Sequence, residues 1–371
     1  CSENPRQRRE EPQSQPQLQP QPQPQSRERG RERDRESAER RRASSGPERE
    51  IEREMEEDEQ TEYLKAEIVR KEEFLTAEVV RKGLRRIGRH PTTLQHAFLE
   101  LCLSDGNLTD IDYLAKYPHI MYLDVSKNSI TSLKVLASLP TLVELNASAN
   151  GITECLNFAA PLCDLSNAWS GGHDAAGSLL TLADLSDNRI PRMISLSPHR
   201  FLEKLLLQNN DISKIEGLSG LKYLQVLDLS YNSIEKIEGL DHLPIRDLRL
   251  RGNQIKTLTG LDKLPTLAHL DVQDNSIASI APLALNAALT HLDLSNNQIE
   301  VIRQTEYLRT ENMPWLSSLL LLDNPCCSKE LYRLRALYRL PNLLTLDNLP
   351  AENEEKVRAF NLYHHSSGDL A

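Results

Sequence analysis

Aliphatic residues recur along most of this chain with a period longer than that of a single helix or strand. The string L-x-x-L-x-L-x-x-N-x-I returns repeatedly from about Leu101, for example as LDLSYNSI and LDLSNNQI. Most steps between its asparagines are 22 residues. Such a fixed period predicts a solenoid, in which every repeat packs on its neighbours. The marker residues are Asn128, Asn150, Asn188, Asn210, Asn232, Asn253, Asn275, Asn297 and Asn324.

Each repeat predicts one short strand followed by a return segment. The aliphatic residues five and three positions before each asparagine alternate inward, and the residue between them points outward. The asparagine side chain can bind backbone groups left unpaired where the coil turns, so that the stacked copies form a ladder. Apolar residues such as Ile234, Ile237 and Leu240 bury the return segment. About six buried aliphatics per repeat, at roughly 1.5 to 3 kcal/mol each, supply the core.

One step of the array is longer than the others. Asn150 and Asn188 are 38 residues apart, and removing residues 162–177 restores 22. A solenoid tolerates such an insertion because the entropy of loop closure rises slowly with length. We interpret the segment as a disordered loop or as a gene-model artefact.

Both ends of the array carry segments that predict caps. Residues 61–98 predict a helical N-terminal cap, in which Thr76 is the N-cap and Val80, Leu84 and Ile87 share one helix face. A first repeat follows with Gly106 at the asparagine position. At the other end, residues 331–350 predict an amphipathic helix and a closing strand. Residues 351–371 form a C-terminal extension.

The N-terminal segment differs in composition from the array. Residues 1–60 are rich in Gln, Pro, Arg and Glu, and they hold too little apolar surface to offset the entropy of ordering. They predict a disordered tail, whose arginines at 40–42 we interpret as solvated rather than as a nucleic-acid or lipid site. The first residue is Cys1 rather than Met, which indicates a fragment or a missing start.

Composition excludes several classes of protein. The formal net charge of -10 over 371 residues disfavours a nucleic-acid partner. The chain has no apolar run long enough to span a bilayer and no apolar N-terminal signal core. Six cysteines without paired spacing are typical of reduced thiols in the cytoplasm. We therefore expect a cytoplasmic protein.

The repeat consensus resembles that of leucine-rich-repeat proteins. The resemblance implies an α/β solenoid, a horseshoe of about ten repeats. The 22-residue period is similar to the subfamily typified by the protein phosphatase 1 regulatory subunit and axonemal dynein light chain. Segments such as ELNASAN, GLDKLP, LLDNP and EEKVRAFNLY resemble the repeat region of the family that joins leucine-rich repeats to a guanylate kinase domain.

That second resemblance implies a function and a possible further domain. Members of the family act in sperm-cell shaping, acrosome attachment and flagellum or cilium assembly. It therefore implies a scaffold with cytoskeletal or axonemal partners, located in the cytoplasm, cilium or flagellum. In that family a guanylate-kinase-like domain follows the repeats, so the resemblance leaves open the alternative that such a domain lies beyond Ala371. The residues given contain no G-x-x-x-x-G-K-[ST] loop, so we assign them no nucleotide site.

The outward strand position predicts an acidic stripe on the concave face of the solenoid. Five of its nine residues are aspartates, a pattern suited to a basic partner, although solvated aspartate is also common in such repeats. Tyrosine and arginine beside the stripe are typical of interface residues. The candidate protein-binding residues are Tyr122, Asp124, Asp184, Asp228, Tyr231, Arg249, Arg251, His269, Asp271, His291 and Asp293.

Metal binding and catalysis have weaker support. His269 and His291 stack with Asp271 and Asp293 in the predicted register, but no cysteine adds to the set, and we expect no metal or cofactor. An open sheet offers no pocket that excludes water, so we expect no catalytic residues and no enzyme. Two alternatives to a scaffold are the repeat portion of a guanylate-kinase-like protein and, less favoured, a phosphatase regulatory subunit.

Overall fold

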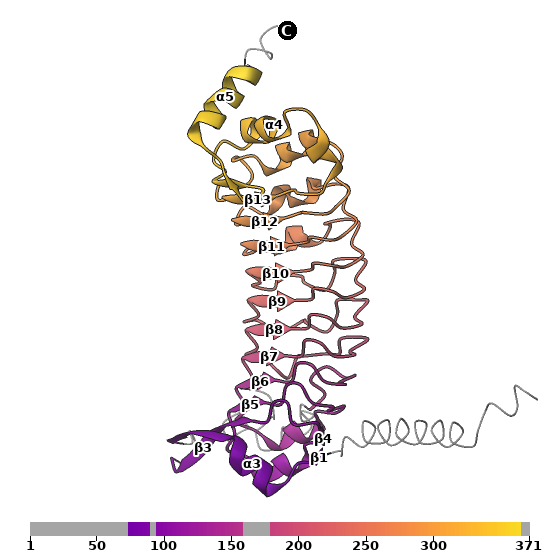
Figure 1. Ribbon diagram of the computed structural model, residues 1–371, viewed down its shortest axis with the longest axis vertical. Coiled ribbons are helices and arrows are strands. Elements are labelled where there is room, and N and C mark those ends of the chain that lie inside the picture. The colour runs from indigo at the N-terminus through magenta and orange to yellow at the C-terminus, as the bar shows by residue number, and fades with distance from the viewer. Residues whose placement is uncertain (1–72, 90–93, 159–178, 365–371) are drawn as a thin grey trace, which may run out of the picture. The chain divides into compact units, whose positions relative to one another are not determined.

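The computed structural model describes residues 73–89, 94–158 and 179–364. Two units divide the chain, residues 1–70 and 71–371, and only the second contains described residues. The predicted tail at 1–60 and the predicted insertion at 162–177 lie outside the described residues. The second unit is a solenoid built on one sheet of 13 strands, which follow one another along the stack (Figure 1).

Each repeat contributes one short strand to this sheet. Neighbouring strands from β3 to β14 pair in parallel and in register, so that Leu227, Leu248 and Leu270 lie side by side. These middle residues are buried, as the period-two alternation predicts. The strands are β3 (His96–Cys102), β5 (Tyr122–Asp124), β6 (Glu144–Asn146), β7 (Leu182–Asp184), β8 (Lys204–Leu206), β9 (Val226–Asp228), β10 (Asp247–Arg249), β11 (His269–Asp271), β12 (His291–Asp293), β13 (Ser318–Leu320) and β14 (Thr345–Leu346).

A ladder of asparagine side chains holds the turn that follows each strand. The amide nitrogen of Asn210 donates to the carbonyls of Leu207 in its own coil and Leu185 in the preceding coil, at 3.1 and 3.0 Å. Its oxygen accepts from the backbone N–H of Ile190 at 3.0 Å. Backbone groups at a buried turn must find partners, and one amide side chain satisfies groups in two successive coils. The nine predicted asparagines all make such bonds.

The convex side returns through short 3-10 helices and extended segments. These helices are η1 (Asp112–Lys116), η2 (Lys134–Ser138), η4 (Leu261–Lys263), η5 (Ala281–Leu285), η6 (Ile302–Leu308) and η7 (Pro325–Ser328). Most of them bury one or more aliphatic side chains, such as Leu136 in η2 and Leu283 in η5, and η7 buries Cys326. One continuous apolar core therefore runs through the whole stack.

The N-terminal cap is only partly helical. Strand β1 (Glu73–Phe74) pairs with β4 (Leu108–Asp110), and helix α3 (Ala77–Gly83) begins after Thr76, whose hydroxyl accepts from the Val79 N–H. The prediction that Leu84 and Ile87 continue this helix is wrong. Both lie in strand β2 (Leu84–Arg89), which pairs antiparallel with β3. Pairing with the first strand of the sheet overrides a local helical pattern, because it satisfies that strand's free edge.

The C-terminal cap contains the predicted helix and one that we did not predict. Helix α4 (Tyr332–Arg339) precedes β14, which pairs antiparallel with β15 (Leu349–Pro350), and helix α5 (Asn353–His364) ends the described chain (Figure 1). Arg333 joins these pieces: its guanidinium donates to both carboxylate oxygens of Glu355 in α5 and to the carbonyls of Leu346 and Pro350.

Replacing one ladder asparagine is expected to destabilise the solenoid. Asn210→Ala leaves the Ile190 N–H without its side-chain partner, and we expect a loss of about 1 to 3 kcal/mol. The Leu185 and Leu207 carbonyls each keep one asparagine donor, Asn188 and Asn232. Urea unfolding followed by circular dichroism measures the loss. Asp211→Ala is the matched control, since that neighbouring side chain is exposed. Equal losses from the two variants would contradict the ladder's role.

Candidate protein-binding surface

The concave face is formed by the outward side chains of the parallel strands. Register pairing brings His269 beside His291 and Asp271 beside Asp293, from strands β11 and β12. Equivalent residues of adjacent repeats are therefore neighbours, about 4.8 Å apart in backbone spacing. Residues 22 positions apart in the sequence make one continuous row.

The aspartates of this row stabilise the turns that follow their strands. One carboxylate oxygen of Asp271 accepts the backbone N–H of Gln273, two residues onward, at 3.0 Å. The same bond occurs at Asp124, Asp184, Asp228 and Asp293. Asn146 makes it as well, with its amide oxygen. The bond needs an acceptor but not a charge, and the turn can form without it, since Arg249 and Leu320 occupy the same position in other repeats. The second carboxylate oxygen is not used by the turn and can take another partner.

Asp228 does not offer a carboxylate to a partner. It is only 5% exposed, and its free oxygen lies 3.6 Å from a guanidinium nitrogen of Arg249 in the next repeat. Arg249 also makes a bidentate interaction with Asp247 on its own strand. Its Nη2 and Nε atoms donate to the two carboxylate oxygens at 2.7 and 3.2 Å. The prediction of an exposed acidic site is wrong for Asp228, because the arginine that interrupts the stripe neutralises it.

Asp124 and Asp184 have no ion pair among the described residues, but Asn146 lies between them in the row. Asp271 and Asp293 are instead direct neighbours. Both are partly exposed, and neither has an ion pair within the described part of the chain. Burial raises the pKa of the Asp271 carboxyl above its ordinary value of 3.8, and the neighbouring Asp293 adds to the rise, while the hydrogen bond from Gln273 opposes it. A cation that reached this pair would relieve the repulsion between two like charges.

The two histidines lie on the same strands as this pair. The rings of His269 and His291 stack with their centroids 4.7 Å apart, and both residues are exposed. Burial, and then the neighbouring His269, lower the pKa of His291. The described residues contain no group of three or more His, Cys, Asp or Glu side chains that could hold a metal ion.

Tyr231 and Arg251 lie at turns rather than on strands. Tyr231 directly precedes a ladder asparagine and has a φ of 54°, a left-handed conformation that is rare for a bulky residue. Its ring has room because the next repeat has Gly252 at the equivalent position, where a Cβ would come within 2.6 Å of the ring. The Arg251 guanidinium lies 5.6 Å from the ring centroid and pairs with Asp274.

The sequence did not predict a pocket that lies at the N-terminal end of the concave face. Its volume is about 500 Å³, and it lies between the β2–β3 hairpin and strands β5 to β7. Arg86 reaches from β2 across the Tyr122 ring, 4.7 Å from its centroid, with Asp124 also in the lining. The helical interpretation of residues 84–87 hid this pocket, since only a hairpin brings Arg86 over the sheet.

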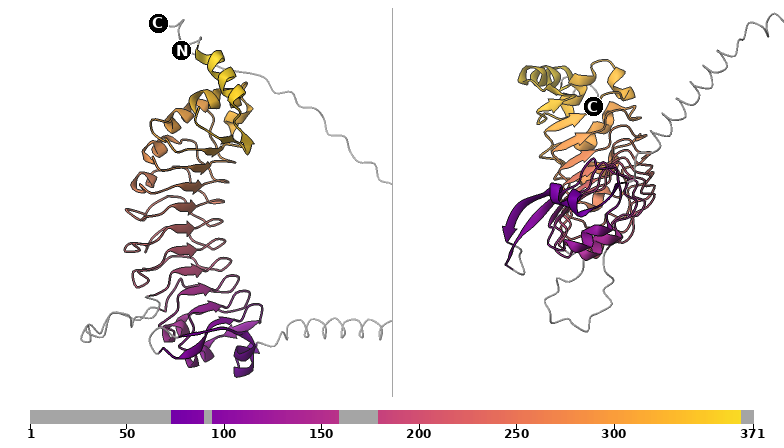
Figure 2. Two further views of the ribbon diagram at one scale, coloured as in Figure 1. Left: turned by 90° about the vertical axis from the view of Figure 1, so that its left-hand side faces the viewer. Right: turned by 60° about the horizontal axis from the view of Figure 1, so that its bottom comes forward.

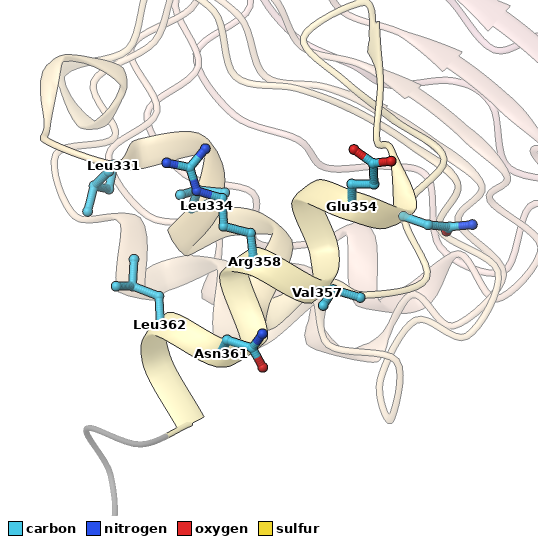
Figure 3. A pocket seen from close by; sticks show the side chains of 8 residues that line it. Leu331, Leu334, Glu354, Val357, Arg358, Asn361 and Leu362 are labelled. Atoms are coloured by element: carbon cyan, nitrogen blue, oxygen red, sulfur yellow. The ribbon is translucent and has the colours of Figure 1, made fainter.

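A second missed feature is an apolar groove on the C-terminal cap. Helices α4 and α5 enclose about 800 Å³ between Leu331 and Leu334 on one side and Val357, Arg358 and Leu362 on the other (Figure 3). The apolar residues of the segment EEKVRAFNLY, at 354–363, could have indicated one wall of this groove.

The described cysteines are free thiols. Cys155 and Cys326 are buried, while Cys102 and Cys327 are partly buried. Burial raises the pKa of Cys155 to about 12, so this thiol is un-ionised and unreactive at neutral pH. Cys1 and Cys163 lie outside the described residues.

Comparisons with known proteins agree with this geometry. Residues 200–242 match the family described as Leucine Rich repeats (2 copies), and residues 286–301 match Leucine Rich repeat. Leucine-rich repeat-containing protein 23 of Bos taurus is 32% identical over 284 residues, which cover 75% of this chain and 77% of the bovine protein. The chain belongs to the leucine-rich repeat-containing protein 23 family. The Homo sapiens member is 30% identical, over 75% of this chain and 76% of its own length.

Two further matches are a cilia- and flagella-associated protein and a solved structure with a similar fold. Cilia- and flagella-associated protein 410 of Mus musculus is 33% identical over 117 residues, which cover 31% of this chain and 46% of that protein. The solved structure of a leucine-rich-repeat protein of Leptospira interrogans has a TM-score of 0.50 at 21% identity, covering 72% of this chain and 71% of that one. This likeness shows the leucine-rich-repeat fold.

The comparisons confirm part of the predicted resemblance. They establish the leucine-rich repeats, and they place the chain in the leucine-rich repeat-containing protein 23 family rather than giving support to a guanylate kinase domain. Among the described residues of this family member, no helix is both long and apolar enough to cross a membrane.

Removing the charge of Asp271 is expected to stabilise this family member at neutral pH. A raised pKa means that the folded state favours the protonated carboxyl, so ionisation costs stability above the unfolded pKa near 3.8. Asp271→Asn removes that cost and keeps the acceptor for Gln273, as Asn146 does. Thermal unfolding should show a gain at pH 7 that disappears below pH 3.8.

Asp271→Ala separates charge from turn geometry. It also removes the charge, but it leaves the Gln273 N–H unpaired, which costs about 1 kcal/mol relative to Asp271→Asn. A gain from Asp271→Asn that stayed constant across this pH range would show that burial of the charge is not its source.

Proposed function

We propose that this chain is a non-catalytic scaffold of a cilium or flagellum, which binds partner proteins on its concave face. The observation that carries the proposal is the in-register pair Asp271 and Asp293, two carboxylates with one free oxygen each and no ion pair in the described part of the chain. They stand on a rigid parallel sheet, so that a partner meets preorganised groups and loses little of its binding energy to ordering them.

The neighbouring residues supply the features expected of an interface. The exposed His269–His291 stack offers flat surface beside the carboxylates, and Arg251 with Tyr231 adds the residue types that dominate binding energy at interfaces. A partner segment with lysine or arginine would be drawn to the carboxylates and would pack on the rings. The partner class is therefore a basic stretch of a cytoskeletal or axonemal protein.

The ciliary context comes from relatives. A protein of Mus musculus that shares 33% identity over 117 residues is named cilia- and flagella-associated. Leucine-rich repeats are also a common architecture of protein-interaction domains, which favours a scaffold over an enzyme. No observation on the described residues favours the nucleotide-binding or phosphatase-regulating alternatives.

Neutralising the carboxylate pair is expected to release the partners. Asp271→Asn with Asp293→Asn keeps both turn hydrogen bonds, because an amide oxygen also accepts, and removes two negative charges. Capture from isolated axonemes with immobilised protein, followed by quantitative mass spectrometry, should show specific partners falling by about tenfold. Glu235→Gln with Glu300→Gln is the control, since both lie on exposed return segments of the repeats.

The two variants separate the possible outcomes. If both retain every captured protein, the partner site is not this part of the concave face. If the control loses as much as the concave variant, net charge rather than the site determines capture.

A further inference from the structure

The N-terminal end of the solenoid presents a basic and apolar hairpin. Strand β2 carries Arg85, Arg86 and Arg89, all exposed, and contains no acidic residue. Ile87 pairs with Phe98 across the hairpin, and their exposed fractions are 66% and 43%. Figures 1 and 2 show β2 and β3 extending beyond the rest of the sheet.

Arg85 lies opposite Glu100 across the hairpin, but the described residues show no ion pair between them. Arg86 contacts the Tyr122 ring, while Arg85 and Arg89 have no ion pair among the described residues. Strand β2 is also the last strand of the sheet, and no other described strand pairs with its outer edge. An exposed edge with an apolar pair and three cations is a surface for association, because solvation alone would favour polar residues at Ile87 and Phe98.

The opposite end of the concave face carries acidic and apolar residues, which complement the basic and apolar residues of the hairpin. Beyond the Asp271 and Asp293 pair, Leu320 of β13 takes the next place in the row, while Ser318 and Thr345 on β13 and β14 are polar. Exposed leucines flank these strands. Leu322 follows β13 and is 39% exposed, and Leu344 precedes β14 and is 64% exposed. Leu349 on β15 is exposed as well. We call Asp271, Asp293, Leu322, Leu344 and Leu349 the acidic-apolar end.

These two surfaces cannot meet within one molecule. Eight strand-to-strand steps separate β2 from β11 in the sheet order, a distance of about 40 Å at roughly 4.8 Å per step. A second copy, placed end to end with the first, brings its N-terminal hairpin to the acidic-apolar end. Arginines then face the uncompensated carboxylates, and Ile87 and Phe98 face the exposed leucines.

We propose that this chain associates head to tail with a second copy of itself, through the β2–β3 hairpin of one molecule and the acidic-apolar end of the next. The contact joins two different surfaces, so each molecule keeps one of each free, and further copies can add to a row or close into a ring. This inference goes beyond the proposed function, since the purified chain alone is sufficient for it. Charge pairing makes the association weaker at high salt.

Sedimentation velocity of the purified full chain tests the inference. We expect the average mass to rise with protein concentration and to fall when salt is raised from about 0.05 to 0.5 M, over which the Debye length shortens severalfold. Arg85→Glu with Arg89→Glu, or Asp271→Arg with Asp293→Arg, should each weaken association at least tenfold. The second pair is compatible with the fold because Arg249 occupies the equivalent position in the repeat of β10.

Mixing the two charge-reversed proteins gives the decisive result. Each fails to associate alone, but the acidic hairpin of one matches the basic end of the other, so the mixture should form complexes. Those complexes should alternate the two proteins, because the remaining surfaces are the unmodified basic hairpin of one and the unmodified acidic-apolar end of the other, which also match. Lys236→Glu with Lys256→Glu reverses two exposed charges elsewhere and should associate as the unmodified protein does.

Several outcomes would overturn the inference. A single monomeric species at every concentration and salt does so, as does association that neither reversal weakens, or a mixture that stays monomeric. Circular dichroism confirms that each variant is folded. The Arg85→Glu, Arg89→Glu protein should still capture axonemal partners, so failure of self-association and failure of the proposed function give different results.

Discussion

The spacing and register of the repeats depend on the hydrogen bonds of the turn that follows each strand. A chain that reverses direction inside a core must satisfy its backbone N–H and C=O groups without water, and here one asparagine per repeat does so for two successive coils. Because each side chain bonds to the preceding repeat, the ladder fixes the distance between repeats as well as the shape of each turn. The strict parallel register of the strands depends on it.

That register turns a one-dimensional sequence pattern into a surface. Residues one period apart become neighbours, so a charge at one position of the repeat becomes a row. The row is constrained from within, since its aspartates also bind the amide two residues onward. Departures from the pattern are therefore more informative than the pattern itself. Arg249 neutralises Asp228, and the left-handed Tyr231 has room only because the next repeat has Gly252.

The two ends of the solenoid differ from the middle because they have only one neighbouring repeat each. A hairpin closes one end and the α4–α5 pair closes the other, with Arg333 joining four segments of the latter. Capping elements usually turn a polar face to solvent. Here the hairpin exposes Ile87 and Phe98, and the groove of α5 exposes Val357, which suggests that interaction as well as capping shaped these ends.

The sequence alone determined the repeat period, the strand positions and the ladder asparagines. These follow from residue types at fixed spacing, and each depends only on contacts with an identical neighbour, so that local and tertiary preferences coincide. The order of charged residues along the outward row of the concave face also follows directly from the sequence.

Tertiary structure decided what depends on contacts with a different neighbour. Asp228 is buried because the following repeat places an arginine over it, and residues 84–89 form a strand because the open edge of β3 lies beside them. Likewise, no spacing in the segment EEKVRAFNLY says that helix α5 docks on α4 through Arg333 and Glu355. A helical pattern and a solvated aspartate are local expectations. The free energy of pairing a strand edge or neutralising a charge depends on which group lies opposite, and only the folded chain settles that.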